Sequence, residues 1–151
     1  MKTEPGECSI DDALAAPKRT VPWTGVRNYQ ARNFMRDSMR QGDGVLFYHS
    51  SCEEPGIAGL AEVASAAYPD PTQFDQSSDY YDPKSRPDAP RWLMVNVRAR
   101  SKTRLVGLAE LRANPALAGM QILRRGNRLS ITPVTVPEWK HIVTRLLKRP
   151  K

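Results

Sequence analysis

The chain has 151 residues, 40% hydrophobic and 26% charged, which is the composition of one soluble globular domain and excludes a largely disordered chain. No apolar run approaches the roughly 20 residues of a membrane helix, and the first ten residues hold no signal core, so we expect a cytoplasmic protein without membrane partners. The net charge of +7 favours anionic partners, nucleic acid first, but four positive charges lie in the last seven residues, so charge alone establishes no binding site.

Two helices and two strands are predicted in the first half of the chain. Each helix begins at a polar residue that can accept a backbone N–H of the first turn, Ser9 in the first and Asn28 in the second. The strands are aliphatic and aromatic runs bounded by turns, and Gly59 indicates a bulge or a close backbone approach in the second. The predicted helices span 10–16 and 28–39, the strands span 45–50 and 57–68, and a basic loop is expected at 17–23.

Residues 69–90 form the most unusual segment. Five prolines and five aspartates exclude a regular element there. The spacing of the acids matches no EF-hand loop, so they are assigned to turns rather than to a metal site. The aromatic residues Phe74, Tyr80 and Tyr81 indicate that the segment packs against the domain, as a lid would.

The C-terminal part predicts two strands and two helices. The last helix has the clearest signal, because Thr135 and Glu138 form a T-x-x-E capping box before an apolar stripe. The predicted strands span 91–100 and 128–134, and a short helix spans 108–114. Short strands alternating with short helices favour an α+β fold, a small mixed barrel with peripheral helices, over a doubly wound sheet. We expect one domain at 1–147, followed by a basic tail at 148–151.

Motifs for catalysis are weak. The glycines match no nucleotide-binding fingerprint, and Cys8 and Cys52 lack the spacing of a zinc site or a disulfide framework, so no metal and no cofactor are expected. His49 and Ser50 end a strand and could donate hydrogen bonds to a ligand. A nucleophile–base pair with His49 is the less favoured alternative, because neighbours on a strand point to opposite faces.

The segment 23–36, WTGVRNYQARNFMR, is the strongest candidate for a binding site. Its arginines Arg27, Arg32 and Arg36 can donate bidentate hydrogen bonds to phosphate. Trp23, Tyr48 and Trp92 offer rings on which a nucleobase could stack. The residue types leave a structural role open, with the tryptophans in the core and Arg32 holding the 69–90 segment.

Several stretches occur in the order found in one known family. MKTEP, WTGVRNYQARNFMR, GDGVLFYHSSCEEPGIAGLAEV, AYPDPTQFD, YYDPKS, PRWLMVNV and LSITPVT followed by EW resemble the EVE domain family over residues 2–147. That family includes bacterial stand-alone proteins. Its members usually carry a few apolar residues before the M-K-x-E-P segment, so the first strand is expected to be short here.

The resemblance implies a PUA-like fold, a small bent β-barrel decorated by helices. It also implies a non-catalytic domain that binds nucleic acid with a modified base, modified cytosine in DNA before RNA, flipped into an aromatic pocket. Trp23 would stack on the base, while Arg27, Asn28 and Ser50 would hydrogen-bond its edge or phosphate. The implied pocket residues are Lys2, Glu4, Pro5, Trp23, Gly25, Val26, Arg27, Asn28, Tyr48, His49 and Ser50, to which the aromatic pattern adds Trp92.

Two other functions stay open at this point. One is an enzyme acting on a nucleotide or a small anionic metabolite with His49 as acid or base. The other is a protein-interaction module that uses the 69–90 segment. The sequence is silent on oligomeric state, and a monomer is assumed.

Overall fold

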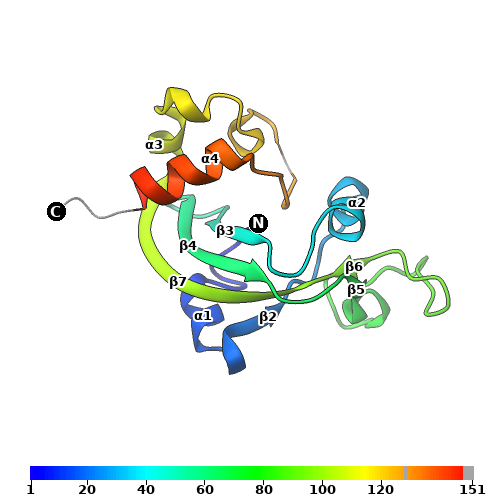
Figure 1. Cartoon of the computed structure of the whole chain (residues 1–151). Helices are drawn as coiled ribbons and strands as arrows, with labels where there is room; N and C mark the ends of the chain where they lie inside the picture. The colour runs from blue at the N-terminus through cyan, green and yellow to red at the C-terminus, as the bar shows by residue number, and fades with distance from the viewer. Residues whose placement is uncertain (128, 148–151) are drawn as a thin grey trace.

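A strongly curved five-stranded sheet forms the centre of the structure, a computed structural model that describes residues 1–127 and 129–147 (Figure 1). The strand order is β1-β3-β4-β7-β2, with β1 parallel to β3 and the other neighbours antiparallel. A small second sheet pairs β5 with β6. The strands are β1 (Lys2–Thr3), β2 (Thr20–Pro22), β3 (Gly44–His49), β4 (Gly56–Val63), β5 (Tyr68–Pro69), β6 (Leu93–Met94) and β7 (Asn96–Gly107).

Short helices surround this sheet and confirm the predicted α+β class. Figure 1 shows α3 and α4 over one end of the sheet, α1 on its other side near β2, and α2 beside β5 and β6. In the described part of the chain, no helix is long and apolar enough to cross a membrane. The helices are α1 (Ile10–Ala15), η1 (Pro17–Arg19), α2 (Tyr29–Asp37), η2 (Pro71–Phe74), α3 (Leu108–Arg112), η3 (Pro115–Leu117), η4 (Gln121–Leu123), α4 (Val136–His141) and the π-helical η5 (Ile142–Leu146).

Three predicted helix starts are confirmed by their caps. Ser9 and Asp12 form a reciprocal capping box at α1, and Thr135 and Glu138 form another at α4. The Asn28 side chain accepts a backbone N–H of the first turn of α2 at 3.1 Å. Each cap satisfies donors that the helix itself leaves unpaired, which is why these local signals could be recognised in the sequence.

Strand β3 lies between two hydrophobic cores. Val45 and Phe47 belong to a cluster that also contains Trp23, whereas Leu46 and Tyr48 belong to a second cluster under α4. Because successive side chains of a strand point to opposite faces, a continuous apolar run serves both cores. Tyr48 and Trp23 therefore lie on different faces of the sheet.

The bulge predicted at Gly59 is confirmed. The pairing of β4 with β7 shifts register between Ile57 and Gly59. A Cβ at Gly59 would lie 2.6 Å from the Ile10 side chain and 2.8 Å from the carbonyl oxygen of Ser101. Glycine is therefore required where α1 presses against the bent sheet.

Several predicted boundaries in the first half of the chain are wrong. The strand predicted at 57–68 ends at Val63, and the helix predicted at 28–39 ends at Asp37. The basic loop predicted at 17–23 contains η1 and strand β2, which pairs with β7 through Thr20, Val21 and Pro22. Three residues with one proline carry too little periodicity to be recognised as a strand.

Two predictions in the second half are also wrong. The strand predicted at 91–100 is divided into β6 and β7, and β7 continues to Gly107 through the polar run 100–104, most of which faces solvent. The described part of the strand predicted at 128–134 is irregular, and Ser130 accepts a single backbone bond from Lys2 at 2.7 Å. Pro133 cannot donate a ladder hydrogen bond. The basic tail predicted at 148–151 lies outside the described residues, and the single domain at 1–147 stays a prediction.

The 69–90 segment packs against the domain, as its aromatic residues predicted. Buried Gln73 holds it, because its Nε2 donates to the carbonyl oxygens of Asp70 (2.7 Å) and Trp92 (2.8 Å), while its Oε1 accepts from the Ser85 hydroxyl and the Trp92 N–H. The side chains of Asp70, Asp75 and Asp82 each accept the N–H two residues further on, which confirms their assignment to turns. The expectation that residues 69–90 hold no regular element is wrong at their start, where Pro69 belongs to β5 and Pro71–Phe74 form η2.

A buried ion pair fastens this segment to the turn after β2. Asp70 is fully buried and accepts from Arg27 Nη1 at 3.1 Å and from the Gly25 N–H at 2.9 Å. Its second oxygen accepts from the N–H and the hydroxyl of Thr72 at 2.8 and 2.6 Å. Burial would raise the pKa of this carboxyl, but the hydrogen bonds from Thr72, Gly25 and Arg27 outweigh burial and lower it.

We predict that Asp70→Asn lowers the free energy of unfolding by roughly 3 kcal/mol at pH 7, about 10 °C in Tm, because Arg27 loses its counterion. The folded-state pKa of Asp70 is lowered, so its stabilisation is present above the unfolded carboxyl pKa of about 3.9 and disappears as the pH falls through the folded-state pKa. The difference in unfolding free energy between wild type and variant is therefore widest at neutral pH and narrows in acid, as thermal unfolding from pH 7 to pH 2 would measure.

Asp75→Asn is the matched control. Asp75 accepts the same pair of local hydrogen bonds, from the N–H and hydroxyl of Ser77 at 2.9 and 2.6 Å, but it is exposed. Its Tm should change far less. Equal losses in the two variants would contradict the role assigned to the ion pair of Asp70 with Arg27.

Candidate functional site

A polar cavity of about 680 Å³ lies where β1, the turn after β2 and the end of β3 meet. It is lined by parts of residues 2–8, 21–26 and 50–51, together with Tyr80, Asn127 and Ser130. Six of the residues implied by the family resemblance line it, namely Lys2, Glu4, Trp23, Gly25, Val26 and Ser50. Segments far apart in the sequence therefore converge on one hollow.

Trp23 lines the cavity but belongs mainly to the core. Only 7% of the residue is exposed, its ring packs edge-on against Phe47 at 5.4 Å between centroids, and its backbone N–H donates to the carbonyl of Val95 at 2.9 Å. The core role weighed from the sequence is thus observed, and the same side chain also reaches the cavity where the predicted stacking would take place. A change to alanine would leave a core cavity that costs roughly 3–5 kcal/mol, so a smaller change is needed to probe binding.

Gly25 allows Tyr80 to reach the cavity. Gly25 has φ +83°, and a Cβ on it would lie 2.6 Å from the Tyr80 ring. Any larger residue would be strained there and would displace the ring. The Tyr80 hydroxyl donates a short hydrogen bond to Glu7, and this bond, together with burial, raises the pKa of Tyr80 to about 12.

Tyr80 and Glu7 were not among the residues predicted for the site. Both line the cavity, but they lie 73 positions apart in the sequence. The aromatic content of the 69–90 segment was the available signal, since it predicted packing without indicating the partner. Their meeting depends on how the segment folds back.

Arg27 holds the cavity wall in place. All five of its guanidinium N–H groups are used within the chain, since Nε and Nη2 donate to the Tyr80 carbonyl, Nη1 to Val26 and Asp70, and Nη2 also to Thr72. The guanidinium carbon also lies 5.5 Å from the centroid of the Tyr80 ring. In this arrangement its donors are committed to the protein rather than to a phosphate.

Three other predicted site residues lie away from the polar cavity. Asn28 caps α2, as described above, and Pro5 lies in the turn that joins β1 to α1. Trp92 is buried, stacks on Tyr29 at 4.8 Å, and donates from Nε1 to Asp82 at 2.7 Å. Trp92 therefore secures the 69–90 segment instead of offering a stacking face to the cavity.

The other two arginines of the 23–36 segment also bond to groups of the protein itself. Arg32 donates to the Arg91 carbonyl at 2.9 Å and lies over the ring of Tyr29. Arg36 pairs with the neighbouring Asp37 at 2.9 Å on the surface. The structural alternative for Arg32 was to hold the 69–90 segment, and the residue that it contacts, Arg91, directly follows that segment.

His49 and Tyr48 are separated by the pleat of β3. His49 Nε2 accepts the N–H of Ile10, the first residue of α1, at 3.1 Å. Burial lowers the pKa of His49, which favours the neutral ring that this acceptor role requires. Among the described residues, no cluster of three His, Cys, Asp or Glu side chains could hold a metal ion.

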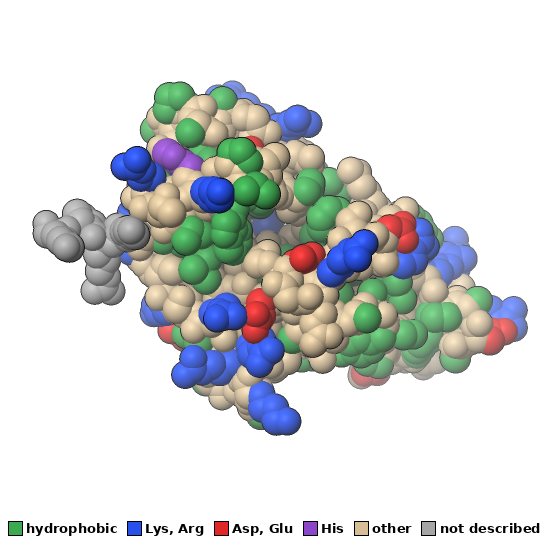
Figure 2. All heavy atoms as spheres, viewed as in Figure 1, with side chains coloured by type: hydrophobic (Ala, Val, Ile, Leu, Met, Phe, Trp, Pro, Cys, Tyr) green, Lys and Arg blue, Asp and Glu red, His purple; other side chains and the backbone are tan. Residues whose placement is uncertain are grey.

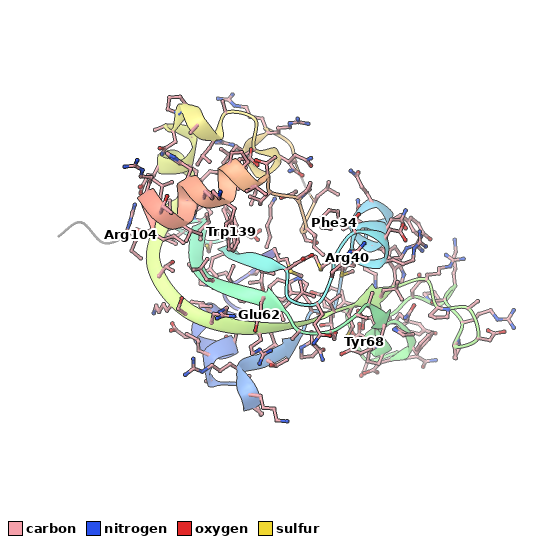
Figure 3. All side chains as sticks on the ribbon, in the orientation of Figure 1. Phe34, Arg40, Glu62, Tyr68, Arg104 and Trp139 are labelled. Carbon is pink, nitrogen blue, oxygen red and sulfur yellow. The ribbon has the colours of Figure 1, made fainter. Side chains whose placement is uncertain are left out.

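Tyr48 lines a different, mainly apolar hollow of about 470 Å³. Figure 2 shows hydrophobic side chains around this hollow between α4 and α2, and Figure 3 labels Phe34 and Trp139 on its two sides. Gly44 lies at its floor, where a Cβ would be 2.6 Å from the Trp139 ring. The predicted trio of stacking rings is therefore divided among two cavities and the core.

One cationic residue lies in the polar cavity, and two others directly precede a strand that lines it. Lys18 and Arg19 are exposed, have positive φ values of 55° and 53°, and directly precede β2, whose Val21 and Pro22 line the cavity. Lys2 lines the cavity itself, where partial burial lowers its pKa and its Nζ donates to the Asn127 carbonyl at 3.3 Å. The site thus combines buried aromatic surface, polar groups and positive charge.

Comparison with known proteins places this geometry in a family. The EVE domain matches residues 1–145. Human thymocyte nuclear protein 1 is 46% identical over 150 residues, which cover 94% of this chain and 66% of that protein, so the chain spans slightly less than two thirds of this relative. The resemblance predicted from the sequence is thereby confirmed.

Solved structures support the same assignment. A crystal structure of a Pseudomonas putida protein superposes with a TM-score of 0.91 at 44% identity and covers 95% of each chain. The human THYN1 protein in complex with 5-methylcytosine-containing DNA has a TM-score of 0.91 at 42% identity, covering 99% of this chain and 97% of that chain. The curved sheet is therefore that of an EVE domain, and the chain belongs to the EVE domain family.

Proposed function

We propose that this domain binds DNA that contains 5-methylcytosine, with the modified base flipped into the polar cavity. The observation that carries the proposal is the similarity to the human THYN1 protein, whose structure was determined in complex with 5-methylcytosine-containing DNA. The similarity extends over 99% of this chain, so it includes every segment that lines the cavity.

The cavity has the size and chemistry for such a base. Its volume of about 680 Å³ is in the range of small-molecule sites. Trp23, Val21 and Val26 offer apolar surface for the ring and the methyl group, while Lys2 and Ser50 offer polar atoms for the base edge. Stacking contributes roughly 1–3 kcal/mol per base and has to offset, with these edge contacts, the few kcal/mol that flipping costs.

In this proposal Arg27 and Asn28 shape the site rather than contact the DNA. The donors of Arg27 hold Tyr80, Asp70 and Thr72, and the Asn28 side chain caps α2. The phosphates would instead meet Lys18 and Arg19, which are exposed beside the strand that lines the cavity. Exposed arginine and lysine side chains of this kind supply most of the sequence-independent affinity for DNA.

We also propose that the domain is not catalytic. The lone pair of His49 Nε2 accepts the N–H of Ile10, so the nitrogen that would act as a base is already occupied. The 69–90 segment turns Tyr80 inward to the cavity, which favours a role in building the site over a role as a docking loop for a protein partner.

The first prediction from this proposal concerns the methyl group and the indole. A duplex with 5-methylcytosine should bind about fourfold more tightly than its unmodified counterpart, since one buried methyl contributes about 0.8 kcal/mol. Trp23→Phe, which keeps most core packing, should weaken binding of the modified duplex about tenfold. Fluorescence anisotropy at about 100 mM NaCl measures both quantities.

Trp139→Phe is the matched control, because Trp139 lines the apolar hollow and not the polar cavity. It should leave the dissociation constant unchanged. Unchanged binding by folded Trp23→Phe would overturn the cavity assignment, and equal losses in the two variants would point to a general loss of folded protein.

The second prediction concerns the phosphate contacts. The double variant Lys18→Ala/Arg19→Ala should reduce the slope of log K against log salt by up to about 2, because each neutralised phosphate contributes about 0.9. The preference for 5-methylcytosine over cytosine should not change. Titrations at several salt concentrations test both expectations.

The comparison is Lys140→Ala/Arg145→Ala, which removes two exposed cations from α4 and η5. In Figure 1, α4 lies over one end of the curved sheet, far from β2. If this pair reduces the salt slope and the first pair does not, the DNA lies on the other side of the domain.

A further inference from the structure

We infer that Glu7, held by Tyr80, makes the cavity select bases that carry an exocyclic amino group, such as cytosine and adenine, over thymine and uracil. The inference rests on the proposed function and names the residue that would read the base. It follows from three features of the cavity wall, the attachment of Tyr80, the orientation of Glu7 and the charge of the groups around them.

Tyr80 is fixed from three sides. Its ring lies against the Gly25 Cα, where even a methyl group would clash. Its carbonyl oxygen accepts two hydrogen bonds from Arg27, at 3.1 and 2.8 Å, and its N–H donates to the Ser78 hydroxyl at 3.1 Å. A tyrosine held in this way presents its hydroxyl at a defined place on the cavity wall.

That hydroxyl orients the carboxylate of Glu7. The Tyr80 O–H donates to one carboxylate oxygen, and the raised pKa of Tyr80, about 12, keeps the proton on the phenol at neutral pH. The other oxygen accepts no hydrogen bond from residues 1–127 or 129–147. Glu7 is an exposed residue that also lines the cavity, so this oxygen can accept a hydrogen bond from a base bound there.

A carboxylate accepts hydrogen bonds but cannot donate them, and this decides which base edge it suits. The N4 amino group of cytosine and the N6 amino group of adenine are donors, whereas O4 of thymine and uracil is an acceptor. The O4 acceptor forms no hydrogen bond with a carboxylate, so a base that presents O4 to Glu7 lacks the contact that an amino group would make.

Lys2 can also hydrogen-bond a base in the cavity, but it does not distinguish cytosine from thymine. Its Nζ lies in the same cavity, close to the Asn127 carbonyl. A cation can donate to the O2 atom that cytosine and thymine share, so it supports both bases equally. Discrimination therefore falls to Glu7.

The test compares 5-methylcytosine with thymine, which share the 5-methyl group and O2 but differ at positions 3 and 4, where 5-methylcytosine has an acceptor nitrogen and a donor amino group and thymine has a donor N3–H and an acceptor O4. Each base is placed opposite an abasic site in the same duplex, so that no base pair has to be opened. Anisotropy then gives the ratio of the two dissociation constants. Wild type should prefer 5-methylcytosine by about tenfold or more.

Two variants alter the contact proposed between Glu7 and the base without changing the hydrophobic core. Glu7→Gln should reduce the ratio to below about threefold, because a side-chain amide can turn either a donor or an acceptor to the base. Tyr80→Phe keeps the ring on Gly25 and releases the carboxylate, so the ratio should fall to an intermediate value. Glu54→Gln removes one exposed acid that does not line the cavity and should keep the wild-type ratio.

Each outcome decides the inference. A ratio near one in wild type, or an unchanged ratio in Glu7→Gln, overturns the role of Glu7 while DNA binding stands. If the ratio of dissociation constants falls to near one in Glu4→Gln but not in Glu7→Gln, Glu4 is the acid that contacts the base, and the role inferred for Glu7 is overturned. Absence of binding to every duplex, modified or not, overturns the proposed function and this inference with it.

Discussion

The rest of the site depends on the hydrogen bonds that the buried carboxylate of Asp70 accepts and on its ion pair with Arg27. It joins the 69–90 segment to the turn after β2 through Arg27 and the Gly25 N–H. A charged group with no exposure is tolerated only when its oxygens are all paired, and here both oxygens accept two hydrogen bonds. This network sets the path of the chain on both sides of the cavity.

The same network explains why the cavity contains Tyr80. Once Asp70 and Thr72 hold Arg27, the remaining guanidinium donors bind the Tyr80 carbonyl. The tyrosine ring then lies on Gly25 and its hydroxyl reaches Glu7. An arginine that looked like a phosphate ligand in the sequence thereby acts as the support for an aromatic wall.

Residues that are adjacent in the sequence face different surroundings on the two sides of the curved sheet. Tyr48 and His49 are neighbours, yet Tyr48 faces the apolar hollow under α4, whereas His49 packs against Phe47 and accepts from Ile10. The family motif Y-H-S thus serves three purposes, since only Ser50 lines the polar cavity. A contiguous motif need not form a contiguous site.

The sequence alone determined the family, the α+β class and the helix starts at Ser9, Asn28 and Thr135, because capping is a local interaction between residues three positions apart. It also indicated Lys2, Glu4, Trp23, Gly25, Val26 and Ser50, which the cavity does bring together. Only the tertiary structure decided the roles of Arg27, Trp92, Glu7 and Tyr80. The contacts that define these roles include Arg27 with Asp70 and Tyr80 with Glu7, which join residues more than 40 positions apart, and residue type alone cannot reveal whether a donor is already bonded within the fold.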